Sequence, residues 1–223
     1  MPSTHLTFHQ QHILQQTGLT LNESGHAVLT DFEAARRFDR DLSLKPIAAT
    51  AWTLTDPTFA RDQLGAYTLA DFVRATLYRS DEERDLVAMA LGIKTRGPYR
   101  WQDNRFCKLM LELMEKRYLF VFFQKYRKHG PGHWSILPCG YDWDGNGRLV
   151  ESEMALFQGC YEQVYRHYKM FVATLVMFYR GGPTSPWLEG IECNWHIVDV
   201  IETLRDHDML EDWSKLVVLC PGW

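Results

Sequence analysis

Oxygen-bearing side chains recur at alternate positions in one segment of the sequence. Asp142, Asp144 and Asn146 are spaced two residues apart, and Glu153 follows seven residues after the asparagine. Carboxylate and amide oxygens are the ligands that hard cations prefer, and Ca²⁺ takes about six to eight of them. The backbone carbonyl of Arg148 lies at a spacing that would add one more oxygen. The sequence therefore predicts a calcium site whose ligands are Asp142, Asp144, Asn146, Arg148 and Glu153.

The segment 142–153 resembles the calcium-binding loop of EF-hand proteins, in which ligands occupy positions 1, 3, 5, 7 and 12. Gly147 stands at position 6, where the chain turns sharply and a glycine tolerates positive φ. Val150 at position 9 has no side-chain oxygen, so water would fill that place. Leu149 at position 8 is apolar, as pairing with a sister loop requires. The resemblance implies Ca²⁺ as the bound ion and helix–loop–helix units as the building blocks of the fold.

The two flanks of this loop differ. The segment 130–141 contains two prolines and three glycines, which disfavour a regular incoming helix. Residues from Met154 onward favour an outgoing helix, and the stretch 153–180 is long enough for that helix, a break and a second helix. The segment 181–192 follows, with Leu188 and Glu192 at positions 8 and 12 of a loop-like frame. It is either the structural partner of the calcium loop or a plain proline-rich turn.

Two further segments, 20–33 and 60–71, share the frame Gly-x-x-x-Leu-x-Asp-Phe, which begins at Gly25 and again at Gly65. Asn22 and Asp31 would take positions 3 and 12 of the first segment, although a register from Asn22 to Glu33 fits about as well. Both segments are interpreted as degenerate hands that keep the fold and have lost the metal. The alternative is a chance similarity between two loop–helix junctions, because aspartate and threonine are ordinary helix caps.

Composition limits the class of protein. The chain has 223 residues, 46% of them hydrophobic, so it can form a substantial core. A net charge of −4 argues against a nucleic-acid binder, and it is too small for a calcium buffer with four full sites. The five cysteines are odd in number and widely spaced, which is not typical of a disulfide framework or a zinc site: Cys107, Cys139, Cys160, Cys193 and Cys220.

The sequence also carries expectations about location. The N-terminus lacks a basic region followed by an apolar run, so no signal peptide is expected. The most apolar stretch, 170–179, is too short to cross a bilayer. These features predict a soluble, cytoplasmic protein without a membrane span, and secretion by a signal-independent route remains open.

The predicted fold class is mainly α, with EF-hand-like helix–loop–helix units in one or two lobes and extra central helices. We expect a degenerate EF-hand-like lobe over 1–79, a central helical segment over 80–130, and a calcium-binding lobe with a C-terminal tail over 131–223. Ser80, followed by three acidic residues, is a typical helix start. The segment 101–129 is predicted to be one long helix with a basic end. It is either a core helix or an internal target helix that an open pair of hands would grip.

The leading hypothesis is a calcium-binding protein with one competent EF-hand-like site, which acts as a calcium-responsive or calcium-stabilised interaction protein. Its partner would be another protein or the internal segment 101–129. The alternative is a hydrolytic enzyme that uses calcium structurally. A cysteine hydrolase would pair His133 with a nucleophile such as Cys139, Cys107, Cys160 or Cys193, and a glycosidase would use a glutamate near 23–26.

Overall fold

The computed structural model describes residues 6–38, 44–77, 80–93, 103–125, 136–142, 148–180 and 185–220. Within these ranges the chain is mainly helical, as predicted. The helices are α1 (Phe8–Gln16), α2 (Phe32–Arg37), α3 (Lys45–Thr55), α4 (Pro57–Leu64), α5 (Leu69–Leu77), α6 (Asp81–Ala90), α7 (Asp103–Lys116), α8 (Glu151–Gln163), α9 (Arg166–Arg180), α10 (Ile197–Asp206) and α11 (Leu210–Leu219), with a short 3-10 helix η2 (Leu119–Val121).

The strands are short, and each pairs with one neighbour in an antiparallel ladder. The pairs are β1 (Leu19–Leu21) with β2 (Ala27–Leu29), β3 (Phe123–Lys125) with β4 (Ile136–Pro138), and β5 (Tyr141–Asp142) with β6 (Arg148–Leu149). Two-stranded ladders of this length are not stable alone, so the helices that pack around them must hold them in place.

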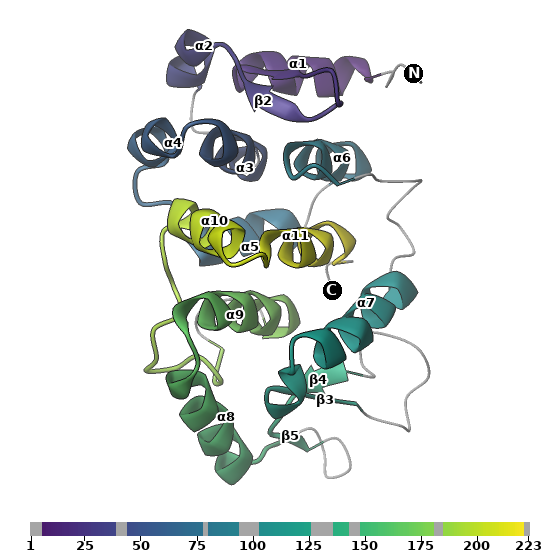
Figure 1. Ribbon diagram of the computed structural model, residues 1–223, viewed down its shortest axis with the longest axis vertical. Coiled ribbons are helices and arrows are strands. Elements are labelled where there is room, and N and C mark those ends of the chain that lie inside the picture. The colour runs from purple at the N-terminus through teal and green to yellow at the C-terminus, as the bar shows by residue number, and fades with distance from the viewer. Residues whose placement is uncertain are drawn as a thin grey trace.

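Successive layers of helices are stacked along the long axis of the molecule (Figure 1). The helices α1 and α2 lie at one end, followed by α3, α4 and α6, then by α5, α10 and α11, then by α9, with α7 and α8 at the other end. Helix α10 contacts α3, α4 and α5 as well as its sequence neighbours α9 and α11. The C-terminal helices therefore pack directly against helices from the first third of the chain.

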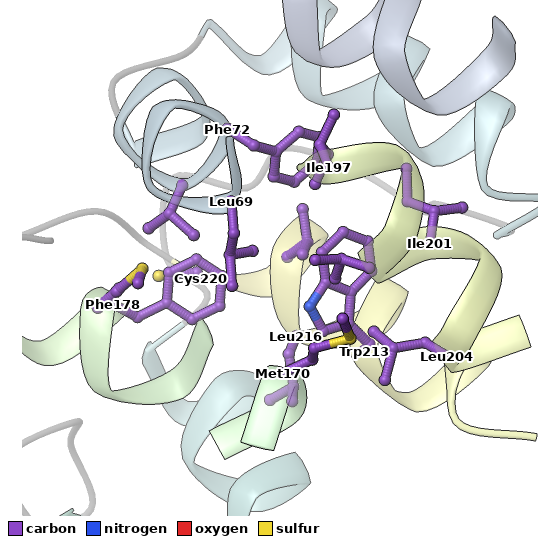
Figure 2. Close-up of a cluster of buried hydrophobic side chains, with 14 of the residues drawn as sticks. Leu69, Phe72, Met170, Phe178, Ile197, Ile201, Leu204, Trp213, Leu216 and Cys220 are labelled. Atoms are coloured by element: carbon purple, nitrogen blue, oxygen red, sulfur yellow. The ribbon is translucent and has the colours of Figure 1, made fainter. Parts of the chain in front are cut away.

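Helices that are distant in sequence share one hydrophobic core. Figure 2 shows side chains from α5, α9, α10 and α11 pointing toward one another. Phe72 of α5 stacks on Trp213 of α11 with ring centroids 5.4 Å apart. The Trp213 indole N–H donates to the hydroxyl of Thr174 in α9 at 3.0 Å, so its one polar atom is satisfied although the side chain is fully buried. This cluster fixes α9, and with it the direction in which α8 leaves the helical body.

The predicted long helix over 101–129 is wrong. Helix α7 ends at Lys116, Tyr118 adopts a left-handed backbone conformation with φ of 54°, and η2 and β3 follow. In the aromatic run that follows, Tyr118 and Phe120 are exposed while Phe122 and Phe123 are buried. Residues 123–125 form β3, whose pairing with β4 satisfies the backbone there. The segment 101–129 is therefore not one continuous target helix, and residues 101–102 and 126–129 lie outside the described ranges.

Within the described ranges, no helix combines the length and apolar character that a bilayer-crossing segment would need.

Candidate metal centre

The predicted calcium loop is entered through a tight turn at Gly140. This glycine has φ of 95°, and a Cβ built on it would lie 2.9 Å from Cγ and 3.2 Å from the backbone nitrogen of Met154 in α8. Its carbonyl accepts a hydrogen bond from the Val150 N–H at 2.9 Å. The beginning of the loop is thus pressed against the first turn of the helix that follows the loop, and only glycine fits this approach.

A β-hairpin holds the two ends of the loop together. Tyr141 is paired with Leu149, and Asp142 with Arg148, so that loop positions 1 and 7 face each other across the ladder. The backbone of Leu149 pairs with Tyr141, at the entry to the loop, and its pairing with a sister loop stays a prediction. The loop is entered from strands rather than from a helix, as the prolines and glycines of segment 130–141 indicate.

Glu153 lies at the neck of this hairpin. Helix α8 begins at Glu151, so Glu153 falls in its first turn, where a carboxylate is favoured by the helix dipole. One carboxylate oxygen, Oε2, accepts a hydrogen bond from the Gly140 N–H at 3.1 Å. The residue predicted to close the coordination sphere is therefore placed against the opposite end of the same loop.

The chemistry of the donor set fits calcium, since every proposed ligand atom is an oxygen. Asp144 and Asn146 lie outside the described residues, and so do the side chains of Asp142 and Arg148. Among the residues that the structure does describe, no group of three or more histidine, cysteine, aspartate or glutamate side chains is arranged to hold a metal ion. The ligand set as a whole therefore stays a prediction, and Glu153 is the member whose placement is seen.

The first of the two segments interpreted as degenerate hands, 20–33, contains a β-hairpin whose polar side chains are hydrogen-bonded to backbone groups. The Asn22 side-chain oxygen accepts hydrogen bonds from the N–H groups of Ser24 and His26, at 3.0 and 2.9 Å. Asp31 caps α2 by accepting from the N–H groups of Glu33 and Ala34. The two oxygens assigned to a lost metal site thus have ordinary turn and cap roles here.

The second of these segments, 60–71, is not a loop along its length. Ala60 to Leu64 belong to α4, Gly65 ends that helix with φ of 57°, and α5 begins at Leu69. Asp71 accepts hydrogen bonds from the backbone N–H and the hydroxyl of Thr68, at 3.1 and 2.7 Å. The interpretation as a degenerate hand is wrong for this segment, because half of the expected ligand positions are helical.

A different internal similarity becomes visible in three dimensions. Gly18 precedes β1 as Gly140 precedes β5, both with positive φ, at 70° and 95°. The Gly18 carbonyl accepts from the N–H of Asp31, the cap of α2, as the Gly140 carbonyl accepts from Val150, the cap of α8. Two hairpin–helix units are therefore built alike. The sequence signal is only a glycine before a short strand, which is too weak to find by inspection.

Residues 185–193 include the described part of the segment 181–192, for which the sequence left open a partner of the calcium loop or a plain turn, and they support α8. Gln158 of α8 donates to the carbonyls of Pro186 and Glu189, at 3.4 and 3.3 Å. The Tyr161 hydroxyl donates to the carbonyl of Glu192 at 3.0 Å. Trp187 is fully buried, and its indole N–H donates to the carbonyl of Cys139 at 2.6 Å. This segment thus contacts both ends of the hairpin–helix unit.

Two of the candidate nucleophiles, Cys139 and Cys193, give little support to a hydrolase. Burial, together with the nearby negative charge of Glu153, raises the pKa of the Cys139 thiol to about 11. Burial also raises the pKa of Cys193, with Glu192 contributing in the same direction. A cysteine nucleophile acts as its thiolate, which neither side chain would form at neutral pH. His133 lies outside the described residues.

Replacement Glu153→Gln is expected to lower the pKa of Cys139 from about 11, because it removes the charge that opposes thiolate formation. The pKa should remain above the ordinary cysteine value, since burial is the larger cause and is unchanged. The pH profile of alkylation by iodoacetamide measures this, with the Cys139 peptide quantified by mass spectrometry. A profile that does not move would show that the Glu153 carboxylate lies away from the thiol in solution.

No known protein family, no curated protein and no solved structure matches this chain. Its function is therefore argued from its own residues.

Proposed function

We propose that this chain is a calcium-binding protein with one competent EF-hand-like site, the loop 142–153. It would act as a calcium-responsive or calcium-stabilised interaction protein. The observation that supports this most is the position of Glu153. Helix α8 starts at loop position 10, as the spacing requires, and its first turn directs the Glu153 carboxylate to the neck of the hairpin that begins at Asp142.

The charge of the loop sets the range of affinity. Three carboxylates are available, from Asp142, Asp144 and Glu153. Sites with this number of charges bind calcium with dissociation constants between about 10⁻⁷ and 10⁻⁴ M. The affinity should fall toward the weak end, because a bidentate Glu153 must first give up the hydrogen bond from the Gly140 N–H.

A change at Glu153 has a direct route to the rest of the molecule. The same helix carries Gln158 and Tyr161, which are hydrogen-bonded to the segment 185–193. A small rotation of α8 would therefore change these hydrogen bonds to the segment 185–193. It would also change the contact with η2, where Phe157 packs on Phe122 with ring centroids 5.3 Å apart. Exposed apolar side chains near η2, among them Phe120 and Val121, would change their surroundings with it.

Replacement Glu153→Gln is expected to weaken calcium binding at least tenfold, because the amide has only one neutral oxygen to offer in place of two charged ones. Isothermal titration calorimetry on the full chain measures this. The matched control is Glu151→Gln, an exposed acidic residue in the same helical turn that is not a ligand position. It should leave the affinity within about twofold of wild type, apart from a weak long-range charge effect.

Unchanged affinity in Glu153→Gln would remove Glu153 from the ligand set. Equal losses in Glu153→Gln and Glu151→Gln would mean that general negative charge, rather than coordination, attracts the ion.

The two modes of action differ in what calcium does to the surface. A responsive protein exposes apolar surface when calcium binds, whereas a stabilised one gains thermal stability at constant surface. Fluorescence of a hydrophobic dye with and without calcium, together with thermal unfolding of the same samples, separates them. A rise in dye fluorescence supports the responsive mode, and a higher Tm with unchanged fluorescence supports the structural one.

A further inference from the structure

The peptide group that joins Cys139 to Gly140 is hydrogen-bonded on both of its sides. Its carbonyl oxygen accepts from the indole N–H of Trp187 at 2.6 Å. Its N–H donates to Oε2 of Glu153 at 3.1 Å. One amide therefore connects a fully buried tryptophan to the carboxylate that is proposed to close the calcium site.

The two hydrogen bonds strengthen each other. A donor at the carbonyl oxygen draws electron density away from the N–H of the same amide, which makes that N–H a better donor. The acceptor here is a carboxylate, so the bond at Glu153 is charge-assisted and stronger than a neutral one. Trp187 thus strengthens the hydrogen bond between Gly140 and Glu153, although the indole and the carboxylate bind opposite edges of the peptide group.

Trp187 belongs to a segment that is anchored to the body of the protein. Beyond it, the Trp195 carbonyl accepts from the Leu69 N–H at 2.8 Å, and the Ile197 N–H donates to the Tyr67 carbonyl at 3.1 Å. These bonds join the end of the segment and the first residue of α10 to the start of α5. A change in the Trp187 hydrogen bond therefore acts on a chain that is fixed at its far end to the helical core.

We infer that the Cys139–Gly140 peptide is a relay between the calcium loop and the buried segment around Trp187. This inference rests on the proposed function of the loop. Without calcium, Trp187 and Gly140 together hold Glu153 back from the loop, which lowers the affinity for the ion. When Glu153 turns both oxygens into the loop, the Gly140 N–H loses its charged acceptor and the Trp187 hydrogen bond weakens. Trp187 is then a positioning residue for Glu153, and its hydrogen bond also reports whether the calcium loop is occupied.

The relay is tested by nuclear magnetic resonance on the wild-type chain during a calcium titration. The indole N–H resonance of Trp187 should move upfield as its hydrogen bond weakens, with the same midpoint that calorimetry gives for calcium. The internal control is Trp52, another buried indole that donates to a backbone carbonyl, that of Thr17, at 2.9 Å. Its resonance should stay in place, because the layers formed by α5, α10, α11 and α9 lie between its helix, α3, and α8 (Figure 1).

The replacement Trp187→Phe gives a second measurement. It keeps an aromatic ring and removes the donor, so the hold on Glu153 weakens and the calcium affinity should rise by about twofold to fivefold. The matched control Trp52→Phe should leave the affinity unchanged. A weaker affinity in Trp187→Phe would overturn the relay, because it would mean that the indole supports the calcium-bound state.

The outcomes separate this inference from the proposed function. If calorimetry on the wild type shows no calcium binding, the proposed function and the relay both fail. If calcium binds but the Trp187 resonance does not move, the relay alone fails and the calcium site stands. If Trp187→Phe does not fold, the calcium titration of the wild-type chain, followed by the Trp187 resonance, is sufficient to test the relay.

Discussion

Replacement of Gly18 by alanine is expected to lower the free energy of unfolding by about 3 kcal/mol. Gly18 has φ of 70°, a conformation that costs an L-residue about 1–2 kcal/mol. A Cβ at this position would lie 2.2 Å from the carbonyl oxygen of Asp31 and 3.0 Å from the backbone nitrogen of Ala35. Both contacts are to backbone, so the start of α2 must move away from β1, at a further cost of about 1–3 kcal/mol.

The matched control is Gly65→Ala. Gly65 has a similar φ of 57°, but nothing lies within 4 Å of the position that its Cβ would take. With ψ of −120°, Gly65 has a backbone that an L-residue rarely adopts, so this variant measures the conformational cost alone, and a loss of about 1–2 kcal/mol is expected. Urea unfolding followed by far-ultraviolet circular dichroism measures both variants. Equal losses at the two positions would show that the close approach of β1 to α2 does not exist in solution.

Replacement Asp212→Asn is expected to cost about 3 kcal/mol at neutral pH. Asp212 is 4% exposed and receives hydrogen bonds from Lys116 at 2.8 and 2.9 Å and from Arg117 at 2.6 and 2.9 Å. These bonds join the C-terminal end of α7 to the first turn of α11. The asparagine would leave the guanidinium of Arg117, whose side chain is only 17% exposed, without its charged partner.

The loss should depend on pH. Burial by itself would raise the pKa of Asp212, but the hydrogen bonds from Lys116 and Arg117 outweigh it and hold the pKa below its ordinary value. A group with a lowered folded-state pKa stabilises the protein above its unfolded-state pKa, about 3.9 for aspartate, and this stabilisation is lost as the pH falls through the folded-state pKa. The difference between wild type and Asp212→Asn should therefore be constant from neutral pH down to about pH 5 and shrink below about pH 4.

The adjacent residue offers the control for this second prediction. Glu211 lies beside Asp212 on α11 but has a side chain that is 77% exposed, paired with Lys215. Glu211→Gln should change the stability by no more than about 0.5 kcal/mol, as is usual for surface ion pairs. Guanidinium chloride is unsuitable here because it screens charge, so urea unfolding across a pH series is the measurement. A pH-independent loss in Asp212→Asn would assign it to packing rather than to charge.

Several elements could be predicted from local sequence because local interactions form them. Ser80 caps α6 in a capping box with Glu83, as the acidic run after the serine indicates. The break between α8 and α9, and the start of α8 after the loop, follow the predicted order. The prolines and glycines of segment 130–141 argued against an incoming helix, and in its described part, from residue 136 onward, β4 and the start of β5 are found.

The segment after Lys116 was predicted wrongly because its apolar run fits a buried helix and a buried strand equally well. Phe122 and Phe123 pack on Phe157 and Tyr179, which come from α8 and α9. The two pairs are separated by 35 and 56 residues in sequence, so no local pattern predicts them. The recurring frame at Gly25 and Gly65 was misinterpreted for another reason. Its aspartates accept hydrogen bonds from nearby N–H groups at helix starts, and the same local pattern fits a cap as well as a ligand.

The sequence by itself determined the mainly helical fold class and the spacing of the candidate calcium ligands, Asp142, Asp144, Asn146, Arg148 and Glu153. Both depend on periodicity and on distances along the chain, which a sequence contains. The tertiary structure decided that the loop closes on its own hairpin, that Glu153 meets Gly140, and that Trp187 lies behind the same peptide group. These contacts join residues that are brought together by packing. They depend on the free energy of forming the whole core, which no single segment of sequence contains.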